Sequence, residues 1–283
     1  MGFRAVTNIA VLQSWRRAAR AVAVLLVVGL LAACDSTPEE TYVERPVEEL
    51  YASAHDEMLE GNFANAARGF DEVERQHPYS PWATRAQVMA AFCYYQDNDY
   101  DQTVIAARRF VELHPGHEDT PYAYYLIAVS YYEQISDVGR DQGTTVLALD
   151  ALEDVGRRYP NSAYAKDSKL KLDLARDHLA GKEMEIGRYY LIRGHYIAAA
   201  NRFREVIERY QTTSHSPEAL HRLTEAYLSL GIKREAQTAA AVLGHNFPNS
   251  AWYRDSYALL AGVNLEPEED EGSWISRAFN YVF

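Results

Sequence analysis

The chain has 283 residues, of which 40 are acidic and 28 are basic, giving a formal net charge of −12 at pH 7. Such a surface repels nucleic acid and anionic lipid headgroups, so it excludes a protein that binds either one through charge alone. Two cysteines are too few for a disulfide framework.

The first 33 residues have the composition of a secretory signal. Four arginines and no acidic residue accompany an apolar run over residues 21–31, which is shorter than the roughly 20 residues of a membrane-spanning helix. The run ends in Leu-Ala-Ala followed by Cys34, which resembles the lipobox of bacterial lipoproteins. We therefore predict a lipoprotein signal peptide over residues 1–33 and lipidation, including palmitate, at Cys34. The alternatives are an ordinary signal with an incidental cysteine, or an uncleaved anchor.

Residues 34–46 are polar and contain few core-forming side chains, so we predict a lipidated N-terminus followed by a flexible tether. More than one acyl chain would hold the protein firmly on a membrane surface. With Cys34 acylated, Cys93 has no disulfide partner. A lone cysteine on a predicted helix is most often a small buried apolar residue.

A fixed frame then recurs five times between residues 47 and 265. A helix-stopping residue leads, seventeen positions later, to proline or its replacement: Gly61 to Pro78, Asn98 to Pro115, Gly143 to Pro160, Gly194 to Gln211 and Gly231 to Pro248. The fifth position of each frame is small, and the ninth and twelfth are mostly apolar. Because these positions share one face of a helix, we expect them to be buried. Self-similarity at a fixed period indicates stacked repeats of the tetratricopeptide type.

We therefore predict an all-α fold, a right-handed helical solenoid of five tetratricopeptide-type helix hairpins over residues 47–265. An insertion falls around residues 135–142, and an extra helix over about 162–180 lies between units three and four. Hydroxyl residues after each frame predict helix N-caps at Ser80, Thr120, Ser162, Ser216 and Ser250. The alternative is a set of helical hairpins that do not stack.

Two further segments follow the predicted solenoid. Residues 266–272 form an acidic linker that we expect to stay solvated. Residues 273–283 form an amphipathic aromatic tail, with apolar side chains at helical spacing at Trp274, Ile275, Ala278 and Phe279. The tail has two alternative roles, either covering the exposed end of the last repeat or docking on a partner.

No catalytic constellation is present, so we expect a protein that is not an enzyme and has no cofactor. Among nine histidines the one close pair is His114 and His117, in a predicted loop. Two potential ligands without a third are weak support for a metal, and we predict no metal site. Helical repeats mostly hold other molecules, so binding is the expected activity.

The 21 tyrosines occur largely in adjacent pairs. Neighbours on a helix diverge by about 100°, so both members of a pair do not face the core. Tyrosine supplies contact area together with a hydroxyl group, which suits interfaces. We predict that Tyr94, Tyr95, Tyr124 and Tyr125 are substrate-binding candidates for extended or partly folded peptide segments.

Three stretches make the chain resemble the BamD family, tetratricopeptide lipoproteins of the outer-membrane β-barrel assembly machinery. They are Gly-Asn-Phe-Ala-Asn-Ala at 61–66 with His-Pro-Tyr at 77–79, Arg-Tyr-Pro-Asn-Ser at 158–162, and Lys-Glu-Met-Glu-Ile-Gly-Arg-Tyr-Tyr-Leu-Ile-Arg-Gly at 182–194, continuing to Asn-Arg at 201–202. The likeness covers about residues 46–261.

The resemblance implies a scaffold on the periplasmic face of the outer membrane. Its implied partners are the periplasmic domains of the barrel-forming assembly component, other assembly lipoproteins and unfolded outer-membrane proteins, with no nucleic acid. The implied partner-binding residues are Arg202, Glu183, Tyr189 and Arg193. An aspartate after the lipobox, Asp35, retains lipoproteins in the inner membrane of some bacteria, so that membrane is an alternative.

Three other functions stay open at the level of the sequence. The first is a periplasmic repeat protein that coordinates envelope constriction with cell-wall synthesis, and the second is a pilotin-like adaptor for secretin assembly. The third is a wall hydrolase on a repeat scaffold, for which the chain offers no catalytic residues. The lipobox and the stretch at 182–194 favour the barrel-assembly scaffold.

Overall fold

The structure is a computed structural model that describes residues 44–280. The predicted signal peptide, Cys34, Asp35 and almost all of the predicted tether lie outside the described residues, as do residues 281–283.

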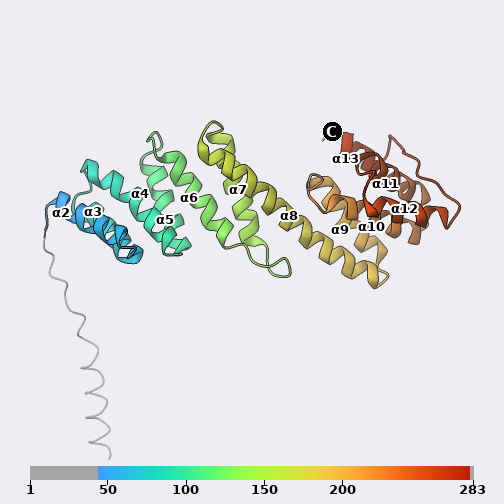
Figure 1. The fold of residues 1–283 in the computed structure, drawn as a ribbon, viewed down its shortest axis with the longest axis horizontal. Helices are drawn as coiled ribbons and strands as arrows, with labels where there is room; N and C mark the ends of the chain where they lie inside the picture. Colours follow the sequence, from blue (N-terminus) through green and yellow to red (C-terminus); the bar gives the residue numbers. More distant parts are fainter. Residues whose placement is uncertain (1–43, 281–283) are drawn as a thin grey trace, which may run out of the picture. The chain divides into compact units, whose positions relative to one another are not determined.

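Every regular element in the described part is a helix, which confirms the all-α prediction. In chain order the helices are α2 (Val47–Leu59), α3 (Phe63–Gln76), α4 (Pro81–Gln96), α5 (Tyr100–Leu113), α6 (Thr120–Glu133), α7 (Gly143–Arg158), α8 (Ala163–Ile192), α9 (Tyr196–Arg209), α10 (Ser216–Ser229), α11 (Lys233–Asn246), α12 (Ala251–Ala261) and α13 (Trp274–Asn280). From α2 to α11 each helix packs on the next, so that successive hairpins stack in a row (Figure 1).

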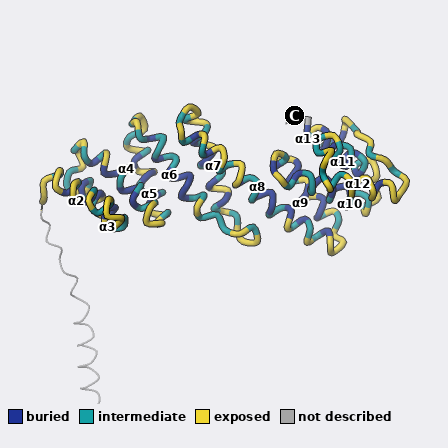
Figure 2. Tube along the Cα trace, viewed as in Figure 1, coloured by how far each residue is buried: buried dark blue, intermediate teal, exposed yellow. Residues whose placement is uncertain are grey.

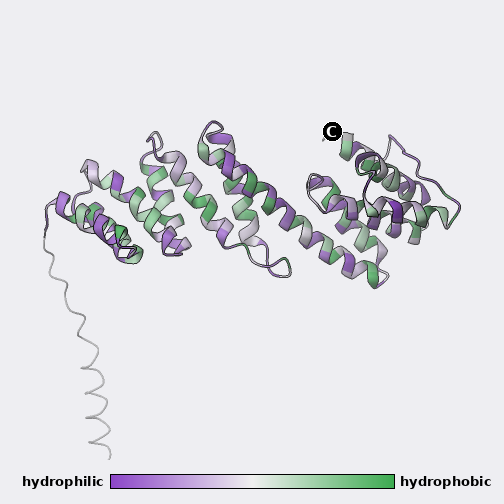
Figure 3. Ribbon diagram, viewed as in Figure 1, coloured by the Kyte–Doolittle hydropathy of each residue, from purple (hydrophilic) through white to green (hydrophobic). Residues whose placement is uncertain are grey.

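The repeating frame is the source of the core. Every residue at the fifth, ninth and twelfth positions of the five frames is at most 1 % exposed, which confirms the predicted buried face. Along the helices, Figure 2 shows buried residues alternating with exposed ones, and Figure 3 shows hydrophobic residues alternating with hydrophilic ones. Four of the five frames begin with a residue at positive φ, as a left-handed helix stop requires: Gly61, Asn98, Gly194 and Gly231.

Gly143 is the exception, and its assignment as a helix stop is wrong. Helix α6 ends at Glu133, residues 134–142 form the predicted insertion, and Gly143 is the first residue of α7. Helix α7 is therefore 16 residues long, where the second helices of the other frames have 14. It still ends two residues before its proline, Pro160, so the buried face keeps its register.

The predicted separate helix between units three and four is also wrong. One 30-residue helix, α8, contains both that segment and the first helix of the fourth hairpin. Directly after the expected end of that helix at about residue 180, a Cβ at Gly181 would lie 3.2 Å from His215 and 3.3 Å from Val138. This glycine allows close packing inside a continuous helix, which no proline interrupts. Helix α8 packs on α7 through one part of its length and on α9 through another.

The predicted N-caps divide into two groups. Ser80, Ser162 and Ser250 are N-caps whose hydroxyls accept backbone N–H bonds, as predicted. Thr120 and Ser216 are instead the first residues of α6 and α10, so those two assignments are wrong. Their hydroxyls donate backward to loop carbonyls, which closes the preceding turn.

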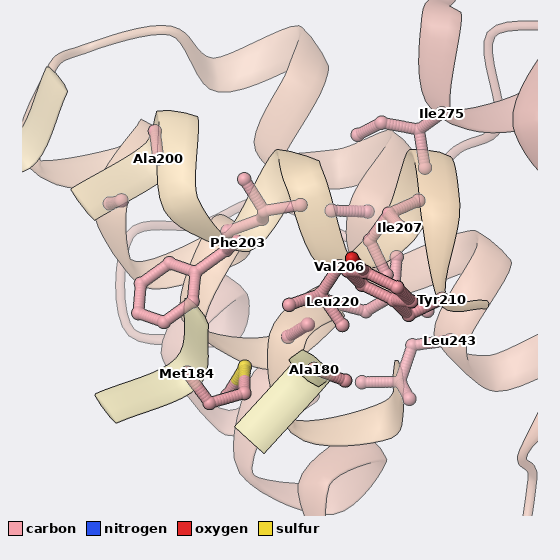
Figure 4. Packing of buried hydrophobic residues seen from close by; sticks show 14 of the residues in the cluster. Ala180, Met184, Ala200, Phe203, Val206, Ile207, Tyr210, Leu220, Leu243 and Ile275 are labelled. Carbon is pink, nitrogen blue, oxygen red and sulfur yellow. The ribbon is translucent and has the colours of Figure 1, made fainter. Parts of the chain in front are cut away.

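The contact between α8 and α9 shows how the frame sets helix spacing. Gly187 of α8 lies under the ring of Phe203 of α9, and a Cβ at Gly187 would approach that ring to 2.4 Å. Figure 4 shows Phe203 beside Met184 in the same cluster. A residue without a side chain is needed here because the Phe203 ring occupies the space that a side chain would fill.

The tail packs on the solenoid of its own chain. Helix α13 lies against α9 and α11, where Ile275 is fully buried and Phe279 nearly so. Figure 4 shows Ile275 reaching toward the cluster that contains Ile207 of α9. The last hairpin is covered by α12, which packs on α10 and α11, so the tail docks on its own solenoid beside α9 and does not cover the end of the last repeat.

The acidic linker is held more firmly than a solvated segment. The acidic side chains of Glu266, Glu268, Glu269 and Glu271 are at least partly exposed, as expected. However, Asp270 forms an ion pair with Arg234 of α11 at 2.8 Å, and the backbone N–H of Asp270 donates to the hydroxyl of Thr238. The linker therefore guides the chain along α11 to the start of α13.

Replacing Gly187 by alanine should lower the free energy of unfolding by roughly 1–3 kcal/mol, because the added methyl group overlaps the Phe203 ring. The matched control is Gly156 in α7, where an added Cβ meets nothing within 4 Å. Gly156→Ala should stabilise the helix by about 0.5–1 kcal/mol. Urea unfolding followed by circular dichroism measures both changes, and equal effects at the two glycines would contradict the packing account.

Ending the chain after Glu271 should lower the melting temperature, because the apolar seat of Ile275 and Phe279 becomes exposed. Burial of one such side chain contributes about 1.5–3 kcal/mol. The control is Arg277→Ala, which changes an exposed residue of α13 and should leave the melting temperature unchanged. An unchanged melting temperature in the truncated chain would mean that the tail does not pack on α9 and α11.

Candidate functional site

The predicted partner-binding arginine lies on the outer face of α9. Phe203 and Val206 of α9 point into the core, so Arg202 points outward and 44 % of its side chain is exposed. One of its guanidinium nitrogens donates to Glu183 of α8 at 3.0 Å. The pairing of Arg202 therefore bridges two helices rather than running along α9.

This ion pair positions the guanidinium more than it stabilises the fold. Exposed pairs contribute about 0–1 kcal/mol, so the stability of α8 against α9 does not depend on it. The nearer carboxylates on α9 have other partners, because Glu205 pairs with Arg209 and Glu208 pairs with Arg204. Arg202 and Glu183 thus form one unit, presented on the surface beside the α8–α9 core.

Tyr189 and Arg193 form a second unit on α8. The guanidinium carbon of Arg193 lies 4.0 Å from the centroid of the Tyr189 ring, and Arg193 also donates to the Tyr189 hydroxyl. Stacking of this kind holds both side chains in place at the end of the helix. No contact joins this unit to Arg202 within the described residues, so the structure brings the four predicted residues together as two pairs.

Exposed apolar residues lie next to the second pair and were missed in the sequence. Ile192 is 86 % exposed and Ile197 is 67 % exposed, on either side of the turn at Gly194. Ile197 also lines a hollow of about 670 Å³ together with Tyr190 and Leu230. Apolar side chains directly flanking a helix stop were a signal in the sequence, because a turn of this kind is normally polar.

Three further hollows follow one another along the second helices of the hairpins. The α3–α5 hollow has a volume of about 520 Å³ over α4, the α5–α7 hollow about 860 Å³ over α6, and the α7–α9 hollow about 530 Å³ over α8. Each is walled by two second helices and floored by the first helix between them.

Tyr94 lines the α3–α5 hollow, and its neighbour Tyr95 does not. The Tyr94 hydroxyl donates to Asp71 of α3 at 2.5 Å. Burial raises the pKa of the Asp71 carboxyl, while the bond from Tyr94 opposes that shift. The ring of Tyr95 instead packs against the ring of Tyr100, with the two ring centroids 5.9 Å apart.

Tyr124 lines the α5–α7 hollow, and its neighbour Tyr125 does not. The Tyr124 ring lies 5.1 Å from the guanidinium carbon of Arg158. Tyr125 donates its hydroxyl to Asp167 of α8 at 2.6 Å, and its ring packs 5.2 Å from Tyr164. The four predicted tyrosines are therefore split, with Tyr94 and Tyr124 facing hollows and Tyr95 and Tyr125 packing against other rings.

The remaining chemical candidates are accounted for by packing. His114 and His117 both pack against the Phe110 ring, at 5.2 and 5.4 Å. No group of three potential metal ligands lies together in residues 44–280. Cys93 is fully buried, as predicted, and burial raises the pKa of its thiol to about 12. No helix in the described region is long and apolar enough to cross a membrane.

Comparison with known proteins places the chain in a family. Residues 43–243 match the model of the YfiO family, described as outer membrane lipoprotein. The chain is 50 % identical to the outer membrane protein assembly factor BamD of Caulobacter vibrioides over 254 residues, which is 89 % of this chain and 83 % of that one. It is 45 % identical to the factor of the same name from Rickettsia prowazekii, over 83 % of this chain and 94 % of that one.

Solved structures with a similar trace include two tetratricopeptide proteins. One is the TPR2AB domain of yeast Sti1, at 12 % identity and a TM-score of 0.40, covering 77 % of this chain and 84 % of that one. The other is a thermophilic TPR protein of Thermus thermophilus, at 20 % identity and a TM-score of 0.35, covering 76 % and 98 %. The family assignment stands on the sequence matches: this chain belongs to the BamD family of outer membrane protein assembly factors.

Proposed function

We propose that the protein is a non-enzymatic lipoprotein scaffold of the outer-membrane β-barrel protein assembly complex. The observation that carries the proposal is the match to an assembly factor at 50 % identity over 89 % of the chain. The stacked hairpins support it, because they offer a long surface of fixed shape. A rigid row of this kind holds two partners at a set separation without any chemical step.

The proposed contact with the barrel-forming component and other assembly lipoproteins lies on α8 and α9. Arg202 is held by Glu183 at one nitrogen and keeps much of its guanidinium surface free for a partner carboxylate or carbonyl. Arginine presented in this way is well suited to interfaces. Tyr189, Arg193 and the exposed Ile192 provide an aromatic and apolar border to the same hairpin.

The proposed substrates are unfolded outer-membrane proteins, received along the hollows of the first three hairpins. Tyr94 and Tyr124 each line one of these hollows, while Tyr95 and Tyr125 pack against neighbouring rings. Aromatic faces accept many side chains, and nearby carboxylates such as Asp71 and Glu74 accept backbone N–H groups of an extended chain. The hollows therefore suit segments that have not yet folded.

The proposed location is the periplasmic face of the outer membrane, with acyl chains on Cys34 as the anchor. The relatives' designation as outer membrane protein assembly factors favours the outer over the inner membrane. An acylated cysteine followed by a short polar tether leaves the helical row free to reach membrane-bound partners. Mass spectrometry of the processed N-terminus tests the anchor, since an unmodified thiol at Cys34 would exclude it.

Replacing Arg202 by leucine should reduce co-purification of the barrel-forming component from detergent-solubilised envelopes by on the order of tenfold, because the guanidinium contact is lost. The melting temperature should stay the same, since the ion pair with Glu183 is exposed.

The control is Arg209→Leu, because Arg209 is also exposed on α9 and also forms an ion pair, with Glu205. It should leave co-purification unchanged. Equal recovery of the partner with Arg202→Leu and with the unchanged chain would remove Arg202 from the proposed interface.

Replacing Tyr94 or Tyr124 by alanine should weaken binding of a urea-unfolded outer-membrane barrel protein several-fold, because each change removes an aromatic face from a hollow. Crosslinking yield against substrate concentration measures the effect. Tyr257→Ala on α12 is the matched control, since Tyr257 is 48 % exposed outside the hollows. If all three variants bind alike, the hollows do not receive the substrate.

A further inference from the structure

Two parts of the chain, residues 100–133 and 196–229, are built to the same plan. In each, two helices of 14 residues are joined by loops of equal length. In both, a hydroxyl at the start of the second helix closes the loop: Thr120 donates to the carbonyl of His114, and Ser216 donates to the carbonyl of Tyr210. Every position on α5 and α6 therefore has a structural counterpart on α9 and α10.

In the second copy of this plan, the tail helix α13 packs in the groove between α9 and α11, which we call its seat. The guanidinium carbon of Arg204 on α9 lies 4.7 Å from the centroid of the Trp274 ring. The Trp274 side chain also contacts Tyr227 of α10, and this contact opposes the rise in the pKa of Tyr227 that burial causes. Ile275 is fully buried below, against the cluster that includes Ile207. The tryptophan thus lies between the arginine, which stacks on its face, and the tyrosine.

In the first copy, Arg108 and Tyr131 occupy the positions of Arg204 and Tyr227. Without a tryptophan between them, they bond to each other, and Arg108 donates to the Tyr131 hydroxyl at 3.1 Å. Both line the α5–α7 hollow of about 860 Å³, the largest of the three hollows along the second helices.

Residues at counterpart positions are more exposed in the α5–α7 hollow than in the α9–α11 groove, which the tail fills. Ile207 is fully buried beneath the tail, whereas its counterpart Val111 is partly exposed. Ala239 of α11 is fully buried, whereas Ala151, at the matching place on α7, is partly exposed. The α5–α7 hollow thus has the apolar base of the tail's seat but no covering segment among the described residues.

The edge of the α5–α7 hollow differs in chemistry from the matching edge of the α9–α11 groove, so a segment bound there should differ from the tail. On α11, Glu235 bonds to the segment that leads into α13, and the matching residue of α7 is Leu147, which lines the α5–α7 hollow and is 47 % exposed. This edge favours an apolar residue over an acidic one.

Two carboxylates also line the hollow without an ion pair to any described residue, Glu112 and Asp150. A basic side chain on the occupant would neutralise them. The hollow therefore fits a segment that is aromatic, apolar and basic, and it disfavours one that is acidic.

We propose that the α5–α7 hollow is a docking site for a short amphipathic helix of a partner protein. The helix places a tryptophan between Arg108 and Tyr131, apolar side chains on Val111 and Ala151, and a basic residue toward Asp150. The tail of this chain shows the binding mode in the counterpart groove. The proposal follows from the internal repeat, and it holds whether or not the tyrosines of the hollows receive unfolded barrel proteins.

The test uses the full chain in detergent and a fluorescent, end-blocked peptide with the sequence of residues 272–280, Gly-Ser-Trp-Ile-Ser-Arg-Ala-Phe-Asn. Fluorescence anisotropy should show saturable binding, since the chain's own tail already fills the α9–α11 groove. Arg108→Ala should weaken the peptide affinity by on the order of tenfold. Alanine in place of the tryptophan of the peptide should weaken it to a similar extent.

A second variant, Ala151→Phe, fills the hollow from α7 and should also remove binding, with melting temperature as the check on folding. Arg254→Ala, on the exposed surface of α12, is the matched control and should bind as the unchanged chain does. Absence of saturable binding would overturn the proposal. So would an affinity lowered by Arg204→Ala but not by Arg108→Ala, because the peptide would then be exchanging with the tail in the α9–α11 groove.

Discussion

Contact between a very small residue on one helix of a hairpin and a larger one on the other determines the spacing of the row. In α8 and α9, Gly187 on the first helix lies under the Phe203 ring, and the first hairpin has the reverse arrangement, with Gly69 on the second helix against Ala54 on the first. Because each first helix packs on the second helices before and after it, one spacing is passed from hairpin to hairpin. Hollows between successive second helices are the geometric consequence.

These hollows give the described surface shape and chemical character that suit binding rather than a chemical reaction. The buried thiol of Cys93 and the packed histidines leave the described surface with ring faces, guanidinium groups and carboxylates at fixed positions. Arg202 and Arg193 are each held by a neighbour, Glu183 and Tyr189, which would lower the entropy lost on binding the proposed partner. The tail is an example within this chain of an arginine at a contact surface, since Arg204 of α9 stacks on the Trp274 ring of α13.

The frame predicted correctly which of its positions are buried, because small and apolar residues at fixed helical spacing lie on one face of the helix, and that face packs inward. The helix boundaries were less accessible. The expected separate helix over about 162–180 continues through Gly181, a close-packing residue inside α8, since His215 and Val138 occupy the space beside it. Thr120 likewise has the sequence of an N-cap, but its hydroxyl bonds to a loop carbonyl that only the folded turn brings near.

The candidate site shows the same division. The outward direction of Arg202 followed from its place between core residues, but its pairing with Glu183 depends on how α9 crosses α8, which the sequence does not encode locally. The seat of the tail was likewise beyond prediction, because it joins α9, α10 and α11 to residues far along the chain. The spacing of residues along a helix indicates which side chains share a face. Which helix packs on that face depends on the tertiary fold.

The central claim, that helix spacing is set by a small residue facing a large one, is tested most directly by a double-mutant cycle between Gly187→Ala and Phe203→Leu. The account predicts that the alanine destabilises the chain with phenylalanine opposite and has little effect with leucine opposite, a coupling of about 0.5–3 kcal/mol. Additive free energies of unfolding would contradict it.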